Sequence, residues 1–309
     1  MNSFYRQDEE LTTLGQQVLE STWAKFPWLE RNQIALTWLV YDNPVPVNTG
    51  GGISAAEFWQ YSIRGYGYRS IESIYPASIV KLFYLVACHE WLQSGMIRPN
   101  PELERAMRDM IVDSSNDATG YVMDVLTGTT SGPELPTGPF ETWKSQRNIV
   151  NRYFQSLNWP ELATVNLNQK TWCDGPYGRE QVFVGENKEN RNLLSTDATA
   201  RLLHSIIGGV AVSAPRSQAM MKLMERSLDP QVLAADPENQ VTGFLGAGLP
   251  LNAQLWSKAG LTSAVRHDAA YIELPGQQPC LLVVFTEGKT AAKNEEILPF
   301  IAAQIAQLV

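Results

Sequence analysis

The sequence predicts an α+β fold, in which an antiparallel sheet flanked by helices is built from both termini and carries an inserted, mostly helical domain. Three observations predict this architecture. Strand-like segments gather near both ends of the chain, an amphipathic helix accompanies each group, and residues from Pro101 to about Gly208 show helical periodicity with few β-branched alternations. The chain of 309 residues is long enough for two domains.

The N-terminal elements follow from the spacing of apolar side chains. Residues Asp8–Lys25 repeat apolar side chains at helical spacing, with acidic residues in the first turn, which predicts a helix. The segments Ile34–Tyr41 and Phe58–Tyr68 predict two antiparallel strands, joined through the Pro- and Gly-rich residues 43–52. The apolar run that follows Ser78 predicts a buried helix, which a Ser-Gly pair ends.

The C-terminal part returns to strand-like sequence. Three short runs separated by glycines predict strands, and an amphipathic helix follows them: residues 254–258, 269–274 and 280–286, then 295–308.

These elements together predict two domains. Residues 1–98 plus 241–309 are expected to form the sheet domain, and residues 99–240 the helical domain. We expect the active site in the cleft between them.

Composition excludes several classes of function. The net charge of −8 repels a phosphate backbone, so no nucleic-acid partner is expected. Cys88, Cys173 and Cys280 are widely spaced and encode neither a disulfide framework nor a zinc ribbon, and no residue spacing indicates a metal or other cofactor. The longest apolar stretch, residues 79–92, is too short and too charged to span a membrane. The N-terminal residues lack the pattern of an export signal, so a cytoplasmic location is expected.

The first candidate for chemistry is the S-x-x-K motif of Ser78 and Lys81. At helical spacing both side chains share one face, and a lysine whose pKa is lowered by burial can take the proton of a serine hydroxyl. The helix N-terminus adds a backbone N–H that can stabilise an oxyanion. The alternative is structural: Ser78 caps the helix and Lys81 is a surface lysine.

Two later motifs favour the catalytic interpretation. Ser114 and Asn116 form an S-x-N motif on a loop between helices, where Ser114 can relay a proton and Asn116 can hold a substrate amide. Lys258 and Gly260 form a K-x-G motif on a strand, where the glycine allows close approach of the backbone. The N–H of Leu261 is a candidate second oxyanion donor.

The order of these three motifs resembles that of the serine β-lactamase and penicillin-binding protein superfamily, and is most similar to the class A β-lactamases. The resemblance covers nearly the whole chain. It implies that Ser78 is the acylated nucleophile, Lys81 its base and Ser114 the proton shuttle. It also implies that Asn116 binds the substrate amide and that Lys258 anchors a substrate carboxylate.

The chain departs from the class A pattern in the segment that carries the deacylation base. Class A enzymes have a Glu-x-x-Leu-Asn segment in an omega loop, whose glutamate activates water, and none occurs here. The nearest similar segment puts Thr164 where the glutamate belongs, with Glu161, Glu180 and Glu186 as alternative bases. Without a positioned base, acylation can proceed while deacylation stalls.

The third motif departs as well. Ala259 stands where the family has a hydroxyl residue that helps to hold the substrate carboxylate. Arg266 is a candidate replacement because a guanidinium binds a carboxylate through two hydrogen bonds, with a pair to Asp268 as the alternative.

These observations support the hypothesis of a serine hydrolase that works through an acyl-enzyme on Ser78. The substrate is a small molecule with a β-lactam or a related amide or ester, and with a carboxylate. The first alternative is a slowly deacylating penicillin-binding, peptidase-like or esterase-like enzyme with a cytoplasmic substrate, and a glutaminase of the same fold is a variant of it. The second alternative is a non-catalytic binding module that retains the fold.

Overall fold

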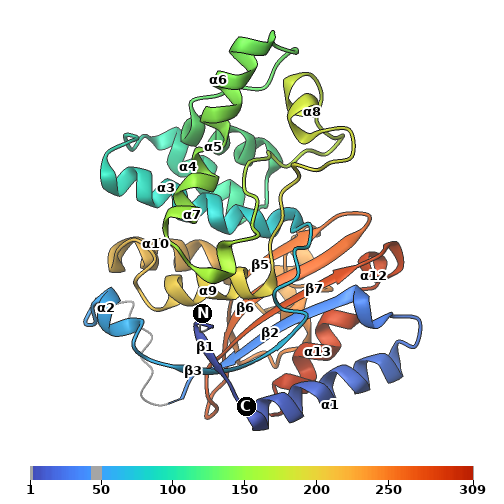
Figure 1. Ribbon diagram of the computed structural model, residues 1–309. Helices are drawn as coiled ribbons and strands as arrows, with labels where there is room; N and C mark the ends of the chain where they lie inside the picture. Colours follow the sequence, from blue (N-terminus) through green and yellow to red (C-terminus); the bar gives the residue numbers. More distant parts are fainter. Residues whose placement is uncertain (1–2, 43–50, 309) are drawn as a thin grey trace.

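The computed structural model describes residues 3–42 and 51–308, and it contains one seven-stranded sheet in the order β1-β3-β2-β7-β6-β5-β4 (Figure 1). The strands are β1 Tyr5–Gln7, β2 Ile34–Val40, β3 Ile63–Tyr68, β4 Glu225–Arg226, β5 Gln254–Leu261, β6 Val265–Glu273 and β7 Cys280–Glu287. All neighbours are antiparallel except β1 and β3. Strands from both ends of the chain therefore meet in one sheet, and the predicted fold class is confirmed.

Helices fill the intervals between the strands. They are α1 Glu9–Lys25, α2 Ala55–Phe58, α3 Val80–Ser94, α4 Pro101–Ile111, α5 Asn116–Thr127, α6 Thr137–Arg147, α7 Ile149–Ser156, α8 Arg179–Val184, α9 Thr196–Ile207, α10 Ala214–Met224, α11 Pro230–Ala235, α12 Lys289–Lys293 and α13 Ile297–Ile305. Among the described residues, no helix is both long and apolar enough to cross a membrane.

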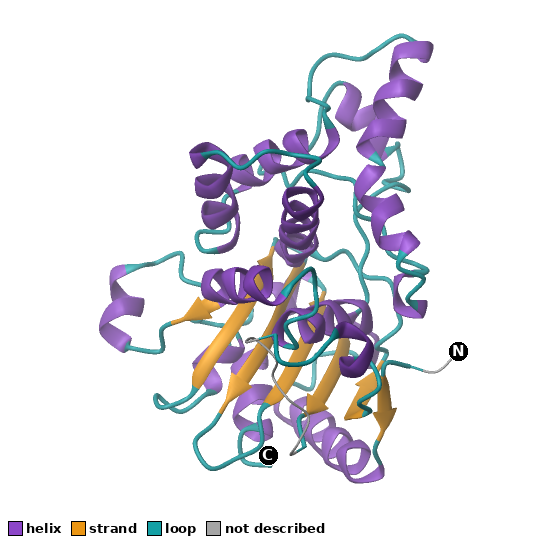
Figure 2. Ribbon diagram, turned by 90° about the vertical axis from the view of Figure 1, so that its left-hand side faces the viewer, coloured by secondary structure: helices purple, strands orange, loops and turns teal. Residues whose placement is uncertain are grey.

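The two faces of the sheet bury two separate cores. Alternate residues of β2 point to opposite faces, so Leu36 and Trp38 belong to a core shared with α1 and α13, whereas Ala35 and Leu39 belong to a core shared with α9, which contacts β2, and with α3. Figure 2 shows the strands between these two groups of helices. Helix α3 is buried on nearly all sides because it lies between the sheet and the upper helices (Figure 1).

Two details of the N-terminal part differ from the sequence prediction. The strand predicted from Phe58 begins only at Ile63, because Ser54 caps the short helix α2 and forms a capping box with Glu57. Residues 43–50 of the predicted connecting loop lie outside the described part of the chain.

The middle of the chain is mainly helical. It also supplies the short strand β4, which pairs with β5 at the edge of the sheet. The division into domains at residues 98/99 and 240/241 stays a prediction.

Candidate functional site

A cavity of about 390 Å³ lies between the loop that joins α4 to α5 and the end of β5. Its lining comes from five separate parts of the chain: Ser78, Asp113, Ser114, Asn116, Pro237, Glu238, Asn239, Gln240, Thr242, Phe244, Ala259, Leu261, Arg266 and Glu295. Five of the residues predicted from the sequence therefore face one space, namely Ser78, Ser114, Asn116, Leu261 and Arg266. Lys81 and Lys258 are completely buried and approach this space through Ser114.

Ser78 lies on a single 3-10 turn, Ala77–Ile79, that leads directly into α3. Ala77 has a φ of 48°, a conformation that is costly for a non-glycine residue and is found where surrounding structure enforces it. A Cβ atom on Gly260 would lie 2.9 Å from the carbonyl oxygen of Pro76 and 3.3 Å from the nitrogen of Ile79. Glycine at this position therefore lets β5 pass directly against the turn that carries Ser78.

His267 ties the same turn to the sheet. Its Nε2 lies 2.9 Å from the carbonyl oxygen of Tyr75, and its Nδ1 accepts the backbone N–H of Thr286 at 3.1 Å. Burial lowers the pKa of His267 to about 4, so the ring is neutral at pH 7 and donates from Nε2. This histidine holds the Ser78 turn in place and does not pair with its neighbour Asp268.

Lys81 is buried rather than at the surface, so the structural alternative for this residue is wrong. Its Nζ lies 2.9 Å from Asn116 Oδ1 and 3.2 Å from Ser114 Oγ, and it also donates to the Ser114 carbonyl oxygen. Burial lowers the pKa of Lys81 to about 7, and the nearby Cys173 opposes that shift. The amine is therefore available as a base near neutral pH.

Ser114 is held between the two lysines. It has a φ of 53°, which turns the chain between α4 and α5 so that its hydroxyl faces the cavity. Its Oγ lies 2.9 Å from Lys258 Nζ, on the other wall of the cavity. Asn116 begins α5, where the preceding Ser115 caps the helix by accepting the N–H of Ala118.

Lys258 is part of a cluster of buried cations. Burial lowers its pKa well below the usual range, the charges of Lys81 and Arg226 lower it further, and Asp268 opposes them. The charge of Asp268 is itself weakened, because burial raises its pKa to about 7. The two lysine amines and the Arg226 guanidinium therefore lie close enough to affect one another beside the cavity, which Asp113, Glu238 and Glu295 also line.

Arg266 lines the cavity, but other groups already engage its guanidinium. It donates to the carbonyl oxygens of Ala292 at 3.0 Å and Gly243 at 3.1 Å, and it lies 3.6 Å from Glu295 Oε1. The carboxylate of Asp268 accepts two backbone N–H groups instead, so the alternative pairing with Arg266 is not formed.

The candidate deacylation bases of the segment between α7 and α9 do not line this cavity. Glu161 pairs with Arg201, and Glu186 lines a different cavity beside Tyr75. Thr164 is exposed, and its backbone oxygen accepts a hydrogen bond from Ser73 at 3.4 Å.

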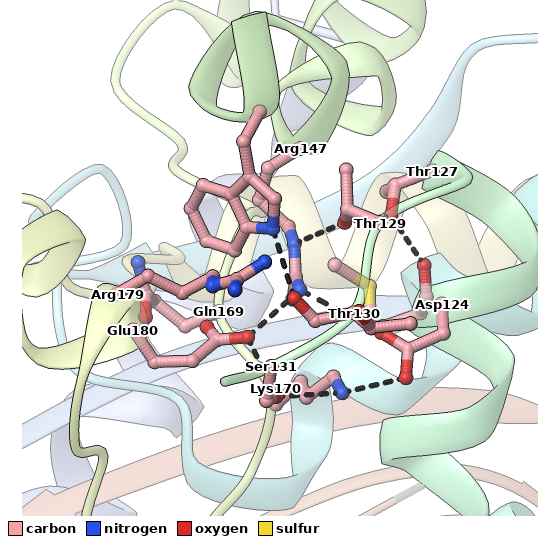
Figure 3. A network of polar contacts seen from close by, with 12 residues as sticks. Asp124, Thr127, Thr129, Thr130, Ser131, Arg147, Gln169, Lys170, Arg179 and Glu180 are labelled. Atoms are coloured by element: carbon pink, nitrogen blue, oxygen red, sulfur yellow. Dashed lines mark hydrogen bonds and ion pairs between the residues drawn. The ribbon is translucent and has the colours of Figure 1, made fainter. Parts of the chain in front are cut away.

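The fourth candidate, Glu180, belongs to a buried ionic network that anchors this segment (Figure 3). Its Oε1 lies 2.7 Å from Arg147 Nη2, and both side chains are completely buried. Beside this pair, Lys170 Nζ donates to Asp124 Oδ2 at 2.8 Å and to Ser131 Oγ at 2.9 Å. Glu180 is therefore committed to holding the segment against α5 and α6.

Sequence reasoning missed two residues of the site. Cys173 comes from the same segment, and its Sγ accepts a hydrogen bond from Asn116 Nδ2 at 3.3 Å. Gln240 lines the cavity and contacts both Lys258 and Ala259. Neither residue belongs to a short motif, so only the folded chain brings them to the site.

Comparison with known proteins identifies a family for most of the chain. A family model described as "Beta-lactamase enzyme family" matches residues 99–309, which excludes Ser78 and Lys81 but includes the other two motifs. No curated protein sequence matches the chain.

Several solved structures share the fold. PBP-A has 16% sequence identity and a TM-score of 0.63, covering 98% of this chain and 97% of that one. A PBP-A mutant, in an acyl-enzyme complex with penicillin G, has 16% identity and a TM-score of 0.65, covering 100% and 98%. A β-lactamase from Sphaerobacter thermophilus DSM 20745 has 17% identity and a TM-score of 0.63, covering 94% and 96%. These identities are low, so the similarity is one of fold.

Proposed function

Because the chain belongs to the β-lactamase enzyme family, we propose that it is a serine hydrolase that forms an acyl-enzyme on Ser78 with a β-lactam or a related amide or ester. The observation that carries the proposal is that two lysines approach the hydroxyl of Ser114. Ser114 Oγ lies within hydrogen-bond distance of both Lys81 and Lys258, and Ser78 faces the same cavity.

In the proposed acylation step, Ser78 Oγ forms a bond to the carbonyl carbon and the amide C–N bond breaks. Lys81, neutral in part near pH 7, takes the proton of Ser78. Its contact with Ser114 provides a path for a proton to the leaving nitrogen. The oxyanion is stabilised by the backbone N–H of Ser78 and by that of Leu261. Water then cleaves the ester and releases the acid.

The proposed substrate carries a carboxylate. Lys258 is buried beside Lys81 and Arg226 and reaches the cavity at Ser114, while Arg266, on the neighbouring strand β6, also lines the cavity. An anionic group that enters the cavity lessens the repulsion among Lys81, Lys258 and Arg226. Asn116 is proposed to hold the substrate amide, since its Nδ2 and Oδ1 lie at the edge of the cavity beside Lys81.

A second candidate is an enzyme that acylates readily and deacylates slowly. The observation that favours it is that Cys173, and not a glutamate, lies beside Asn116. Of the glutamates in the same segment, Glu161 and Glu180 pair with arginines, and Glu186 lines a different cavity. Three acidic residues line the cavity: Asp113 pairs with Arg108, Glu295 lies beside Arg266, and Glu238 is exposed on the segment that also carries Gln240. None of the three lies in the segment between α7 and α9, and without a carboxylate positioned at the ester, water has a poor base for attack.

Hydrolysis of a chromogenic cephalosporin distinguishes the candidates. A β-lactamase turns over many equivalents, a slow enzyme releases one equivalent in a burst, and both signals vanish in Ser78→Ala. The control is Ser94→Ala at the exposed far end of α3, which should keep the wild-type signal. If no signal appears, reaction of Ser78 with a fluorophosphonate would support an esterase-like or peptidase-like enzyme. An unreactive Ser78 would overturn both candidates and support a binding module.

A further inference from the structure

Gln240 joins the two walls of the cavity through its side-chain amide. On the sheet side, its Oε1 accepts hydrogen bonds from Lys258 Nζ and from the backbone N–H of Ala259, the latter at 3.2 Å. On the helical side, its Nε2 donates to the carbonyl oxygens of Ile111 at 2.9 Å and Val112 at 2.7 Å. An amide has two acceptor sites and two donor hydrogens, so all four are used.

Gln240 connects the segment that leads to Ser114 with the strand that carries Lys258, and these two residues form part of the proposed proton path. Val112 follows directly on α4 and precedes Ser114 by two residues, and Lys258 lies on β5. The side chain is 6% exposed, so its hydrogen bonds are shielded from water and fix its position. Moving either wall would break two of these bonds and leave a buried polar group without a partner, which is costly.

We infer that Gln240 is a positioning residue, which holds Lys258 as an ammonium at hydrogen-bond distance from Ser114. This role rests on the proposed function, because it matters to catalysis only if Lys258 and Ser114 serve the acylation of Ser78. The amide supplies an acceptor for the ammonium without adding a full negative charge. It also holds the N–H of Ala259, at the position where the side chain has no hydroxyl of its own.

The charged groups that face Lys258 set the direction of the effect. Lys81 on α3 and Arg226 on β4 disfavour the ammonium form, and Asp268 on β6 favours it. Gln240 adds an acceptor from a fourth segment. Replacing it with an apolar side chain of similar length should weaken the ammonium form, whereas a carboxylate in its place should strengthen it.

The test compares Gln240→Met and Gln240→Glu with the wild type. The second-order rate of penicillin attachment to Ser78 is followed from pH 5 to 10 by intact-protein mass. We expect Gln240→Met to lower the second-order rate constant of penicillin attachment at least tenfold, mainly by raising the penicillin concentration that gives half of the maximal rate. It should also move the alkaline limb of the pH profile to lower pH. Gln240→Glu should move that limb to higher pH. Gln231→Met, on the exposed helix α11, is the matched control and should leave both unchanged.

A role in stability alone would lower the melting temperature and leave the shape of the pH profile unchanged. An unmoved alkaline limb in folded Gln240→Met would therefore overturn the inference. To separate this result from a failure of the proposed function, Lys258 is also titrated by NMR in unreacted protein with 13C-labelled lysine, with Lys258→Met for assignment. If wild-type Ser78 forms no adduct, the proposed function is wrong. If the titration of Lys258 is the same in Gln240→Met and wild type, the role of Gln240 is wrong.

Discussion

Lys258 Nζ lies 2.9 Å from Ser114 Oγ, although 144 residues separate the two in the chain. Lys81 approaches the same hydroxyl at 3.2 Å. One oxygen is thereby shared between a lysine of the helix that follows Ser78 and a lysine of the sheet. The pair Ser114 and Lys258 joins the two walls of the cavity at the point where the proposed proton path runs.

The first prediction concerns the pH dependence of acylation. Burial lowers the pKa of Lys81 to about 7, so the fraction of neutral amine rises as the pH rises toward 7 and levels off above it. The rate of Ser78 acylation by a penicillin should therefore increase about tenfold per pH unit below pH 7 and level off near pH 7, before it falls on the alkaline limb where Lys258 loses its proton. Stopped-flow or quench mass measurements between pH 5 and 9 give the profile.

Lys81→Met tests whether Lys81 is the base that causes the rise in acylation rate below pH 7. It should acylate at least about 100-fold more slowly, since general-base catalysis contributes on that order. If the variant kept the wild-type rate, or if the wild-type rate did not change with pH, Lys81 would not be the base.

The second prediction concerns the close approach of β5 to the nucleophile. Gly260→Ala should slow acylation at least tenfold and lower the melting temperature, because the added methyl group meets the carbonyl oxygen of Pro76 at 2.9 Å. Gly138→Ala is the control, since a Cβ atom there meets no other atom within 4 Å. Equal acylation rates for Gly260→Ala and Gly138→Ala would show that acylation does not depend on the close approach of β5 to the turn that carries Ser78.

The third prediction uses the exposed thiol beside Asn116. Cys173 is exposed whereas Cys88 and Cys280 are buried, so iodoacetamide should label one thiol in the native chain and three after unfolding. The label should slow acylation of Ser78 because it crowds the amide of Asn116, 3.3 Å from the sulfur. Cys173→Ser treated with the same reagent should keep its untreated rate. A labelled wild type that acylates at full speed would contradict this placement.

The fourth prediction concerns the network that anchors the segment from residue 168 to 184. Glu180→Gln leaves the completely buried Arg147 with Asp124 Oδ1, at 3.6 Å, as its remaining carboxylate partner, and breaking a buried pair of this kind costs about 3–5 kcal/mol. Denaturant unfolding should show a loss of this order. Glu141→Gln removes an exposed pair with Lys144 and should cost less than about 1 kcal/mol. If both variants lost the same small amount, the buried network would not stabilise the segment.

Local spacing predicts the geometry within each motif, whereas the meeting of the three motifs in one site was expected from the resemblance. Ser78 and Lys81 lie one helical turn apart, and Asn116 starts a helix at a capping serine, so short motifs predict their geometry. The strands were predicted from strand-like runs bounded by Pro- and Gly-rich segments, and the sheet formed by both termini from the occurrence of such runs near both ends of the chain.

Contacts between distant segments were not predictable in this way. Arg266 binds the carbonyl oxygens of Gly243 and Ala292, and any residue type offers such an oxygen. Gln240 and Cys173 act through contacts with segments more than ten residues away, which no single motif encodes. The path of the segment after α7 decides which of its side chains reaches Asn116. The sequence suggested Thr164 as the residue in the place of the deacylation glutamate, whereas in the fold it is Cys173 that lies beside Asn116.

The central claim is that Ser78 becomes acylated, and intact-protein mass after incubation with benzylpenicillin tests it most directly. We predict an increase equal to the mass of one penicillin, mapped by peptide analysis to the segment with Ser78 and absent from Ser78→Ala. After free penicillin is removed, the rate at which the original mass returns measures deacylation. An adduct on another residue, or an unchanged mass in a reaction that is also insensitive to a fluorophosphonate, would contradict the account.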